Sequence, residues 1–246
     1  MSTEDVKEHY ETLLAEHYTW MCGDFDRRVE ETIAFFRRLT LETSPERALD
    51  LGCGSGIQSI ALAQLGYEVT AVDFQASLLE ELRELASGLS IKTIESNLTA
   101  LDPSSDLGGP FDLAVCMGDT LPHLPDADAV RQLISSTAKS RLKPEGRFIV
   151  GFRDLSQELT GSDRAIPVRL DDDRVMLTFL EYLPERVMVH DMVLDRRKGE
   201  WQLQKNAYPK LRLSEVGVKE MLTEAGFTIE ETSVTRGMCH LVAHRS

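Results

Sequence analysis

Short apolar runs and amphipathic segments alternate along the chain up to residue 152. Continuous apolar runs are typical of strands buried on both faces, whereas apolar positions that recur every three or four residues are typical of helices. The runs predict strands at residues 47–52, 67–73, 90–96, 111–118 and 146–152. Strands and helices that alternate at this spacing form a parallel sheet covered on both faces, so we expect an α/β fold.

The helical pattern fills the segments between these strands and the segment before them. It predicts helices at residues 57–66, 75–87 and 126–143, and two more within residues 4–40 that are separated near residues 19–25. Gly66 is expected to end the first of these helices, since glycine readily adopts the left-handed conformation that stops a helix. Pro144 and Gly146 are expected to close the helix at 126–143.

After residue 153 the alternation of strands and helices is replaced by consecutive strands. Antiparallel strands are predicted at residues 174–183, 185–197 and 200–208, followed by a helix at 213–226 and strands at 227–234 and 238–245. Turns at Pro184 and at Lys198-Gly199 separate the first three strands, and Ser214 is a plausible N-cap of the helix. We interpret residues 154–210 as an insertion on a single domain of residues 1–246, because so thin a segment buries little core of its own.

The charge balance narrows the class of partner. The 246 residues include 41 acidic and 27 basic side chains, which gives a formal net charge of −14. A nucleic-acid-binding protein needs a basic surface to displace counterions from phosphates, and the sequence has no basic stripe. No apolar run approaches the roughly 20 residues of a membrane span. We therefore expect a small-molecule partner, with neither nucleic acid nor membrane.

The cysteines and the first residues indicate the compartment. Cys22, Cys53, Cys116 and Cys239 lie far apart and form no CxxC pair, so we expect neither a disulfide framework nor a metal site. The opening residues, MSTEDVKEHYE, are acidic and polar, unlike a secretory signal. Both observations favour a reducing cytoplasm.

A glycine-rich loop follows the first predicted strand. Gly52, Gly54 and Gly56 alternate with other residues, and glycines without a Cβ let backbone amides touch a ligand. A P-loop would need a Lys-Ser/Thr pair that is absent, and a nicotinamide fingerprint would need glycine where Ile57 stands. Asp73 ends the next strand, where a carboxylate can accept both hydroxyls of a ribose. The loop therefore predicts a nucleoside cofactor.

Residues 50–56, an acidic residue followed by GxGxG, resemble motif I of the class I S-adenosylmethionine-dependent methyltransferases. The resemblance implies a Rossmann-like sheet of seven strands, mostly parallel with the last strand antiparallel, and an antiparallel β insertion after the fifth strand. It also implies S-adenosyl-L-methionine as the cofactor. In such folds Asp50 lies near the methionine ammonium group. The residues expected to contact the rest of the cofactor include Gly52, Cys53, Gly54, Asp73 and Phe74.

Further motifs are similar to those of the glycine N-methyltransferase-like branch of this family. The pair Asn97-Leu98 corresponds to residues that contact the adenine. By the same resemblance, the backbone of Met117 faces the cofactor, and His123 lies beside the methionine moiety or the methyl group. Arg153 matches an arginine that holds a substrate carboxylate. The alternatives are a turn asparagine, a structural histidine and an ordinary salt bridge of the arginine.

The amino-terminal segment and the stretch after the insertion refine this resemblance. In this branch, aromatic residues of an amino-terminal helical segment, here residues 1–42, close over the cofactor, which implies this role for Tyr18 and Trp20; ordinary hydrophobic packing is the alternative. The branch continues with tyrosines after the serine that corresponds to Ser214, where this chain has Glu215 and Val216. This departure argues against glycine as the acceptor.

The expected function is methyl transfer to a small-molecule acceptor by in-line displacement, with N-methylation of an amine favoured. Such a reaction needs no metal; His123 is the best base by residue type, and Asp119 could attract a cationic amine. The insertion at 154–210 is expected to form a wall or lid that excludes water. Alternatives are O-methylation, a macromolecular acceptor, a nicotinamide-dependent oxidoreductase and a cofactor-binding protein without turnover. The oligomeric state is open, with a homodimer as one option.

Overall fold

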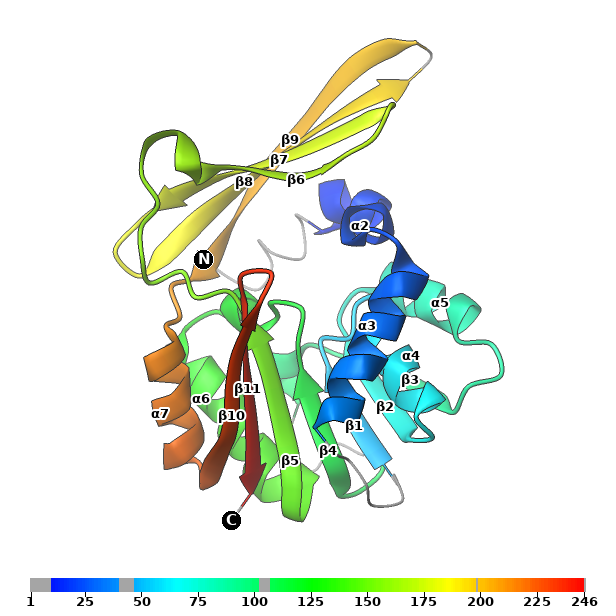
Figure 1. The fold of residues 1–246 in the computed structure, drawn as a ribbon, viewed down its shortest axis with the longest axis vertical. Coiled ribbons are helices and arrows are strands. Elements are labelled where there is room, and N and C mark those ends of the chain that lie inside the picture. Colours follow the sequence, from blue (N-terminus) through cyan, green and yellow to red (C-terminus); the bar gives the residue numbers. More distant parts are fainter. Residues whose placement is uncertain (1–9, 40–46, 102–106, 198, 246) are drawn as a thin grey trace.

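A computed structural model of the chain describes residues 10–39, 47–101, 107–197 and 199–245. Its main element is a seven-stranded sheet in the order β10-β11-β5-β4-β1-β2-β3, shown in Figure 1. All neighbouring strands pair in parallel except β11, which is antiparallel to both β5 and β10. The strands are β1 (Arg47–Leu51), β2 (Glu68–Asp73), β3 (Ile91–Glu95), β4 (Phe111–Cys116), β5 (Leu142–Phe152), β10 (Phe227–Thr235) and β11 (Met238–Arg245). The predicted sheet, with its antiparallel last strand, is confirmed.

Helices cover both faces of this sheet, as the continuous apolar strands require (Figure 1). One face packs against α3 (Phe25–Arg38), α4 (Ile57–Gln64) and α5 (Ala76–Leu85), and the other packs against α6 (Ala127–Ser136) and α7 (Glu215–Glu224). Alternate residues of one strand serve the two cores: Phe148 of β5 is buried on the α6 and α7 side, and Ile149 is buried on the other. Both faces of the sheet are therefore closed to solvent.

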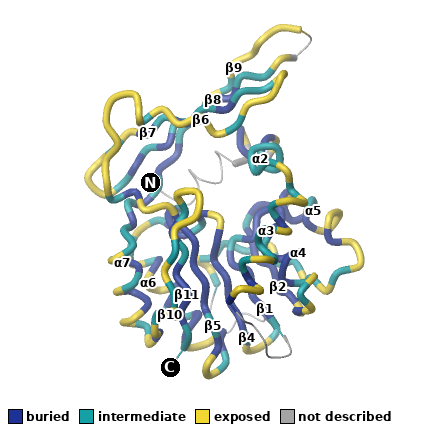
Figure 2. Tube along the Cα trace, in the orientation of Figure 1, coloured by how far each residue is buried: buried dark blue, intermediate teal, exposed yellow. Residues whose placement is uncertain are grey.

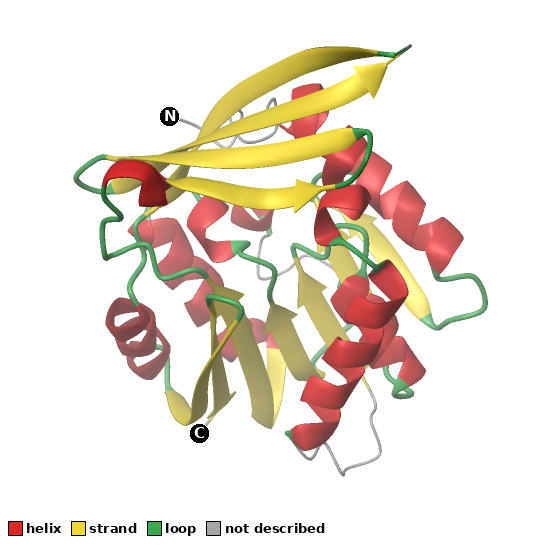
Figure 3. Cartoon of the chain, turned by 45° about the horizontal axis from the view of Figure 1, so that its top comes forward, coloured by secondary structure: helices red, strands yellow, loops and turns green. Residues whose placement is uncertain are grey.

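The insertion is a four-stranded antiparallel sheet in the order β6-β7-β8-β9. It consists of β6 (Ala165–Leu170), β7 (Arg174–Tyr182), β8 (Arg186–Arg197) and β9 (Glu200–Leu211). Figure 3 shows this sheet lying across the end of the molecule toward which the parallel strands point. One face is apolar and buried against Leu13, Leu14 and Leu155, whereas the outer residues and the tips are exposed (Figure 2).

The amino-terminal segment links the two sheets. A π-helical turn at Tyr10–Leu14 leads into α2 (Ala15–Cys22). The helix ends at Gly23, and α3 begins two residues later. The Asp24 side chain caps α3 by accepting a hydrogen bond from the backbone N–H of Arg27. The predicted break near residues 19–25 is confirmed. Residues 1–9 and 40–42 of the expected amino-terminal segment lie outside the described residues.

Two details differ from the sequence prediction. The helix expected at 126–143 ends earlier, in a π-helical turn at Thr137–Arg141, and Pro144 and Gly146 lie inside β5 rather than closing the helix. The pairing of β4 with β5 shifts register between Phe111 and Leu113, so Pro144 occupies an irregular part of the ladder where its missing N–H costs little. Strand β6, which contains Pro167, was not predicted; it is an edge strand, the position in a sheet that tolerates proline.

Candidate cofactor and active site

A cleft of about 630 Å³ opens at the carboxyl ends of the parallel strands. Ligands of open α/β sheets bind at this edge. The cleft brings together most residues that the sequence identified as cofactor contacts: Tyr18, Gly52, Gly54, Asp73, Phe74, Asn97, Leu98 and His123. Leu78, Gly118, Thr120 and Leu124 also line it and were not predicted.

The glycine loop forms one wall of this cleft. Gly52 and Gly54 both have positive φ angles, 78° and 54°, which favour glycine. A Cβ on Gly52 would lie 2.4 Å from the Thr120 side chain, and a Cβ on Gly54 would lie 2.9 Å from the Tyr18 hydroxyl. Backbone and neighbouring side chains are therefore so close here that only glycine leaves room for a ligand against the loop.

Asp73 holds the loop from the end of β2. Its Oδ2 accepts a hydrogen bond from the backbone N–H of Gly54 at 2.8 Å, and its Oδ1 accepts one from Gln75 at 2.9 Å. Burial raises the pKa of this carboxyl, although these backbone donors oppose the rise. The backbone N–H of Phe74 is a third donor to this carboxylate. Because a carboxylate offers about four lone-pair positions, at least one stays available for a ligand hydroxyl.

Asn97 presents its amide to the other side of the cleft. Its Oδ1 accepts hydrogen bonds from both the backbone N–H and the hydroxyl of Thr99, at 3.0 and 2.9 Å. The carbonyl oxygen is therefore occupied, and the NH2 group is the part of the amide that can donate to a ligand. The sequence showed only that this residue could pair with an adenine edge; the structure indicates which half of the amide is available.

Asp50 lies outside the residues that line the cleft. The side chain is 1% exposed, and the Ser59 hydroxyl donates a hydrogen bond to its Oδ2 at 2.6 Å. Burial raises the pKa of the Asp50 carboxyl to about 7, and the nearby Asp73 adds to the rise. A cation close to the loop would favour its ionised form. The expected contact of Asp50 with an ammonium group stays a prediction.

Cys53 and Met117 also lie outside the lining, next to residues that form it. The Cys53 thiol is buried and faces the carbonyl of Gly54, and burial raises its pKa well above the ordinary value. Such a thiol is a poor nucleophile. The carbonyl of Met117 accepts a hydrogen bond from the Thr120 hydroxyl at 2.9 Å. Both residues support the shape of the cleft through Gly54 and Thr120.

Trp20 is directed toward the insertion rather than the cleft. Its indole N–H donates to Asp171 Oδ2 at 2.6 Å, and the guanidinium of Arg174 lies 4.5 Å from its ring centroid. Of the two aromatic residues expected to cover the cofactor, only Tyr18 lines the cleft. The two side chains therefore connect α2 to different parts of the molecule.

Arg153 follows β5 and is exposed. Its backbone N–H donates to Asp119 Oδ1 at 2.9 Å, and its Nη1 lies 3.4 Å from the carbonyl oxygen of Arg236 in the β10–β11 turn. The guanidinium is not among the groups that line the cleft. The structure thus does not bring Arg153 together with His123 and the glycine loop, and its role toward an acceptor stays a prediction.

His123 is the titratable side chain at the side of the cleft that faces the insertion. It ends a short 3-10 helix (Leu121–His123), and its ring stacks on Tyr208 of β9 with 5.3 Å between centroids and 5° between planes. Tyr208 is buried, and burial raises the pKa of its hydroxyl well above the usual value. The pair joins the parallel sheet to the insertion at the cleft.

Asp119 and Lys210 form a buried ion pair beside this stack, 2.5 Å from Nζ to Oδ2. Burial opposes ionisation of Asp119, but Lys210, His123 and the hydrogen bond from Arg153 outweigh it and hold the pKa of the carboxyl below its ordinary value. The backbone of Asp119 has a φ of 75°, which is uncommon for a residue with a side chain. Tyr208 and Lys210 were not predicted as site residues.

Residues 48–146 match the family model described as "Methyltransferase domain". Two curated relatives are the glycine N-methyltransferase of Rattus norvegicus, 29% identical over 142 residues, and the ubiquinone biosynthesis O-methyltransferase of Xylella fastidiosa (strain 9a5c), 40% identical over 113 residues. These matches cover 54% and 44% of this chain, and 48% and 42% of the relatives. The chain therefore spans about half the length of the curated relatives it matches, or less.

Among solved structures, the fold is similar to that of CalS10 with bound S-adenosylmethionine, an amino pentose methyltransferase from Micromonospora echinaspora involved in calicheamicin biosynthesis. The TM-score is 0.74 at 15% identity, and the match covers 95% of this chain and 97% of that one. At this identity the likeness concerns the fold, and it includes the insertion as well as the parallel sheet. None of the described helices has the length and apolar composition needed to cross a membrane.

Proposed function

Because the chain belongs to the class I S-adenosylmethionine-dependent methyltransferases, we propose that it transfers a methyl group from S-adenosylmethionine to a small-molecule acceptor, with an amine favoured. The observation that carries the proposal is the arrangement of Asp73 and the glycine loop, where a buried carboxylate lines the same cleft as the backbone of Gly52 and Gly54.

Each part of the cleft suits one part of the cofactor. Asp73 accepts the ribose hydroxyls, and the NH2 group of Asn97 donates to a ring nitrogen of the adenine, whose face packs on Leu98. Gly52 and Gly54 admit the chain that bears the sulfonium. When bound, the cofactor supplies a methyl group already activated by positive sulfur, so transfer needs orientation rather than a covalent enzyme intermediate.

The residues between the cleft and the insertion serve the acceptor. His123 accepts the proton that an amine loses, because an imidazole titrates near neutral pH and this one borders the cleft. The Asp119 carboxylate stabilises the imidazolium that results. The ion pair with Lys210 weakens the attraction between Asp119 and this imidazolium, so that His123 can release the proton again. Tyr208 fixes the plane of the imidazole by stacking. The insertion covers this side and excludes water.

Arg153 has a conditional place in this proposal. To hold an acceptor carboxylate, its exposed side chain must turn from the β10–β11 turn toward Asp119. Because arginine binds a carboxylate through two parallel hydrogen bonds, an acidic amine would gain the most from such a movement. The relatives named above include both N- and O-methyltransferases, so they do not decide between an amine and a hydroxyl acceptor.

The test has two stages. Titration calorimetry with S-adenosylmethionine and S-adenosylhomocysteine measures cofactor binding, and absence of binding by both would contradict the proposal. A screen of amines, amino acids and aminosugars against hydroxyl analogues of matched shape, read by mass for a donor-dependent gain of one methyl group, then identifies the acceptor. Binding without transfer to any acceptor would favour a protein that binds the cofactor without turnover.

A pair of histidine variants tests the role of the proposed base. His123→Ala should lower turnover by roughly 100-fold or more, the usual contribution of a general base, while changing S-adenosylhomocysteine affinity much less. His190→Ala is the control, because His190 pairs with Glu181 on the exposed side of the insertion. Unchanged turnover in His123→Ala would remove this residue from catalysis.

A further inference from the structure

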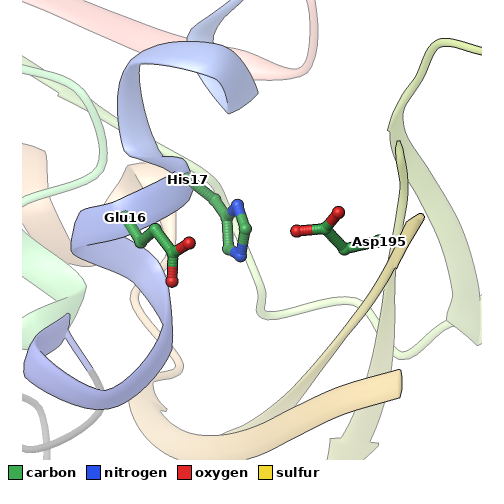
Figure 4. A group of neighbouring side chains, drawn as sticks. All are labelled: Glu16, His17 and Asp195. Carbon is green, nitrogen blue, oxygen red and sulfur yellow. The ribbon is translucent and has the colours of Figure 1, made fainter. Parts of the chain in front are cut away.

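Glu16, His17 and Asp195 meet where α2 packs on the insertion (Figure 4). One ligand atom of each side chain, a carboxylate oxygen or an imidazole nitrogen, lies within 4.8 Å of the others. Within the described residues this is the only group of three such side chains that comes together in this way. Two of the residues are neighbours on α2, and the third comes from β8, far along the chain.

We propose that these three side chains form a binding site for a divalent transition-metal ion that fastens α2 to β8. One nitrogen and two carboxylate oxygens are a donor set that suits Zn²⁺, with a water in the remaining position. Ligands bound at about 2.1 Å around tetrahedral zinc lie roughly 3.4 Å from one another. The ligand atoms therefore need to approach one another by at most roughly 1.4 Å.

The burial of His17 supports the assignment. The residue is 1% exposed, whereas Glu16 is exposed and Asp195 is partly buried, so the cluster has a buried end and an end open to solvent. An ion can enter from the open end and find an imidazole fixed by its surroundings. The ring of Trp20, one turn later on α2, meets the His17 ring edge-on at 6.3 Å between centroids, which fixes its orientation further.

Separate contacts already hold α2 and the π-helical turn before it against the insertion. Trp20 donates to Asp171 at 2.6 Å, and Asn206 of β9 donates to the Thr12 hydroxyl at 2.7 Å. The three ligands are therefore held near one another before an ion arrives, and most of the entropy cost of bringing them together is already met. A divalent ion would also neutralise the two carboxylates of the cluster.

A proton is the competing occupant. If His17 were protonated, its imidazolium could bridge the two carboxylates without any metal. The two occupants respond oppositely to acid, since metal binding requires a neutral imidazole and weakens as pH falls below about 6.5. An imidazolium bridge would form in that same pH range.

The experiment uses the full chain, freed of metal with a chelator and titrated with ZnCl2 by calorimetry at pH 7.5, then with CoCl2 to record the visible spectrum of the bound ion. We expect one ion per chain, and at least about tenfold weaker binding in each of His17→Gln, Asp195→Asn and Glu16→Gln. His190→Gln is the matched control, because His190 lies on the same strand as Asp195 but pairs with Glu181 and meets the ring of Phe179, and it should bind as the unaltered chain does. Circular dichroism checks that each variant folds.

Four outcomes would overturn the proposal. Zinc binding that is unchanged in His17→Gln and Asp195→Asn would be adventitious. Absence of zinc binding at micromolar concentration would show that the cluster is not a metal site. A gain in thermal stability at pH 5.5 that is lost in His17→Gln would show that a protonated His17 bridges the two carboxylates instead. Equal loss in the His190→Gln control would show a nonspecific effect. Because the titration uses no cofactor, its failure would leave the proposed methyl transfer untouched.

Discussion

The two sheets of this molecule differ in how many of their faces are buried. In the seven-stranded sheet both faces are covered, and Phe148 of β5 has no solvent exposure. In the insertion only one face is covered, and Leu203 of β9 is 56% exposed on the other. The first sheet supports the glycine loop, whereas the second brings Tyr208 against His123 and Lys210 against Asp119. The proposed cofactor site therefore depends on a core buried on both faces, and the proposed acceptor site depends on how a thinner sheet packs onto that core.

The largest test of this contrast compares one apolar truncation in each sheet. Phe148→Ala should lower the free energy of unfolding by about 3–5 kcal/mol, because it leaves a cavity where Phe148 packs on Phe227 with 5.6 Å between ring centroids. Leu203→Ala should change it by less than about 0.5 kcal/mol. Urea unfolding followed by circular dichroism measures both, and losses of similar size would erase the contrast.

A smaller effect is expected when one carboxylate is neutralised in each region. Asp73→Asn should weaken S-adenosylhomocysteine binding by about 2–3 kcal/mol, since it places an amide NH2 against a backbone N–H and removes an acceptor for the ribose. Asp163→Asn, in the 3-10 helix Gly161–Arg164 of the insertion, removes the same charge far from the cleft. Calorimetry on both variants measures the affinity for S-adenosylhomocysteine. An unchanged affinity in Asp73→Asn would show that Asp73 does not bind the ribose.

The smallest effect concerns the buried Asp50 beneath the glycine loop. Its pKa is about 7 in the folded chain against an ordinary value of 3.8, so the folded form holds the proton more tightly. The resulting stabilisation is complete below the ordinary value and is lost as pH rises through 7. Asp50→Asn stays neutral and should therefore gain about 1–2 kcal/mol relative to the unaltered chain between pH 5 and pH 8.

Urea unfolding of both proteins at the two pH values measures this difference. A constant difference would show that the Asp50 carboxyl is not held neutral by its surroundings. Repeating the pair with saturating S-adenosylmethionine adds a second reading, because an ammonium group near Asp50 should lower the pKa and reduce the pH dependence.

The parallel sheet could be predicted from the sequence because its signals are local. A strand buried on both faces is apolar over a continuous run, as in residues 113–116, and a glycine loop between a strand and a helix is recognisable from its spacing. Asp73 and Asn97 were found for the same reason, since each follows a strand whose carboxyl end reaches the same edge. The cleft gathers Gly52, Gly54, Asp73 and Asn97.

The acceptor side could not be predicted in this way because its contacts depend on long-range docking. Lys210 pairs with Asp119, 91 positions away in the sequence, and no sequence motif links the two residues. Strand β6 was not predicted because it contains a proline and is exposed at almost every position, so it lacks the alternation of apolar and polar residues that is typical of a half-buried strand. Trp20 was expected in the cleft on the basis of its type, but only the direction of the helix decides that Tyr18 faces the cleft and Trp20 faces Asp171.

Helix α2 has a kinetic consequence. Tyr18 lies over Gly54 at the cleft, the neighbouring Thr19 hydroxyl donates to Glu81 of α5 at 2.5 Å, and Trp20 is tied to the insertion. A displacement of α2 large enough to let a cofactor leave must therefore loosen the cover over the acceptor as well. The two products would share one exit step, so we expect turnover to be limited by the opening of this single helix.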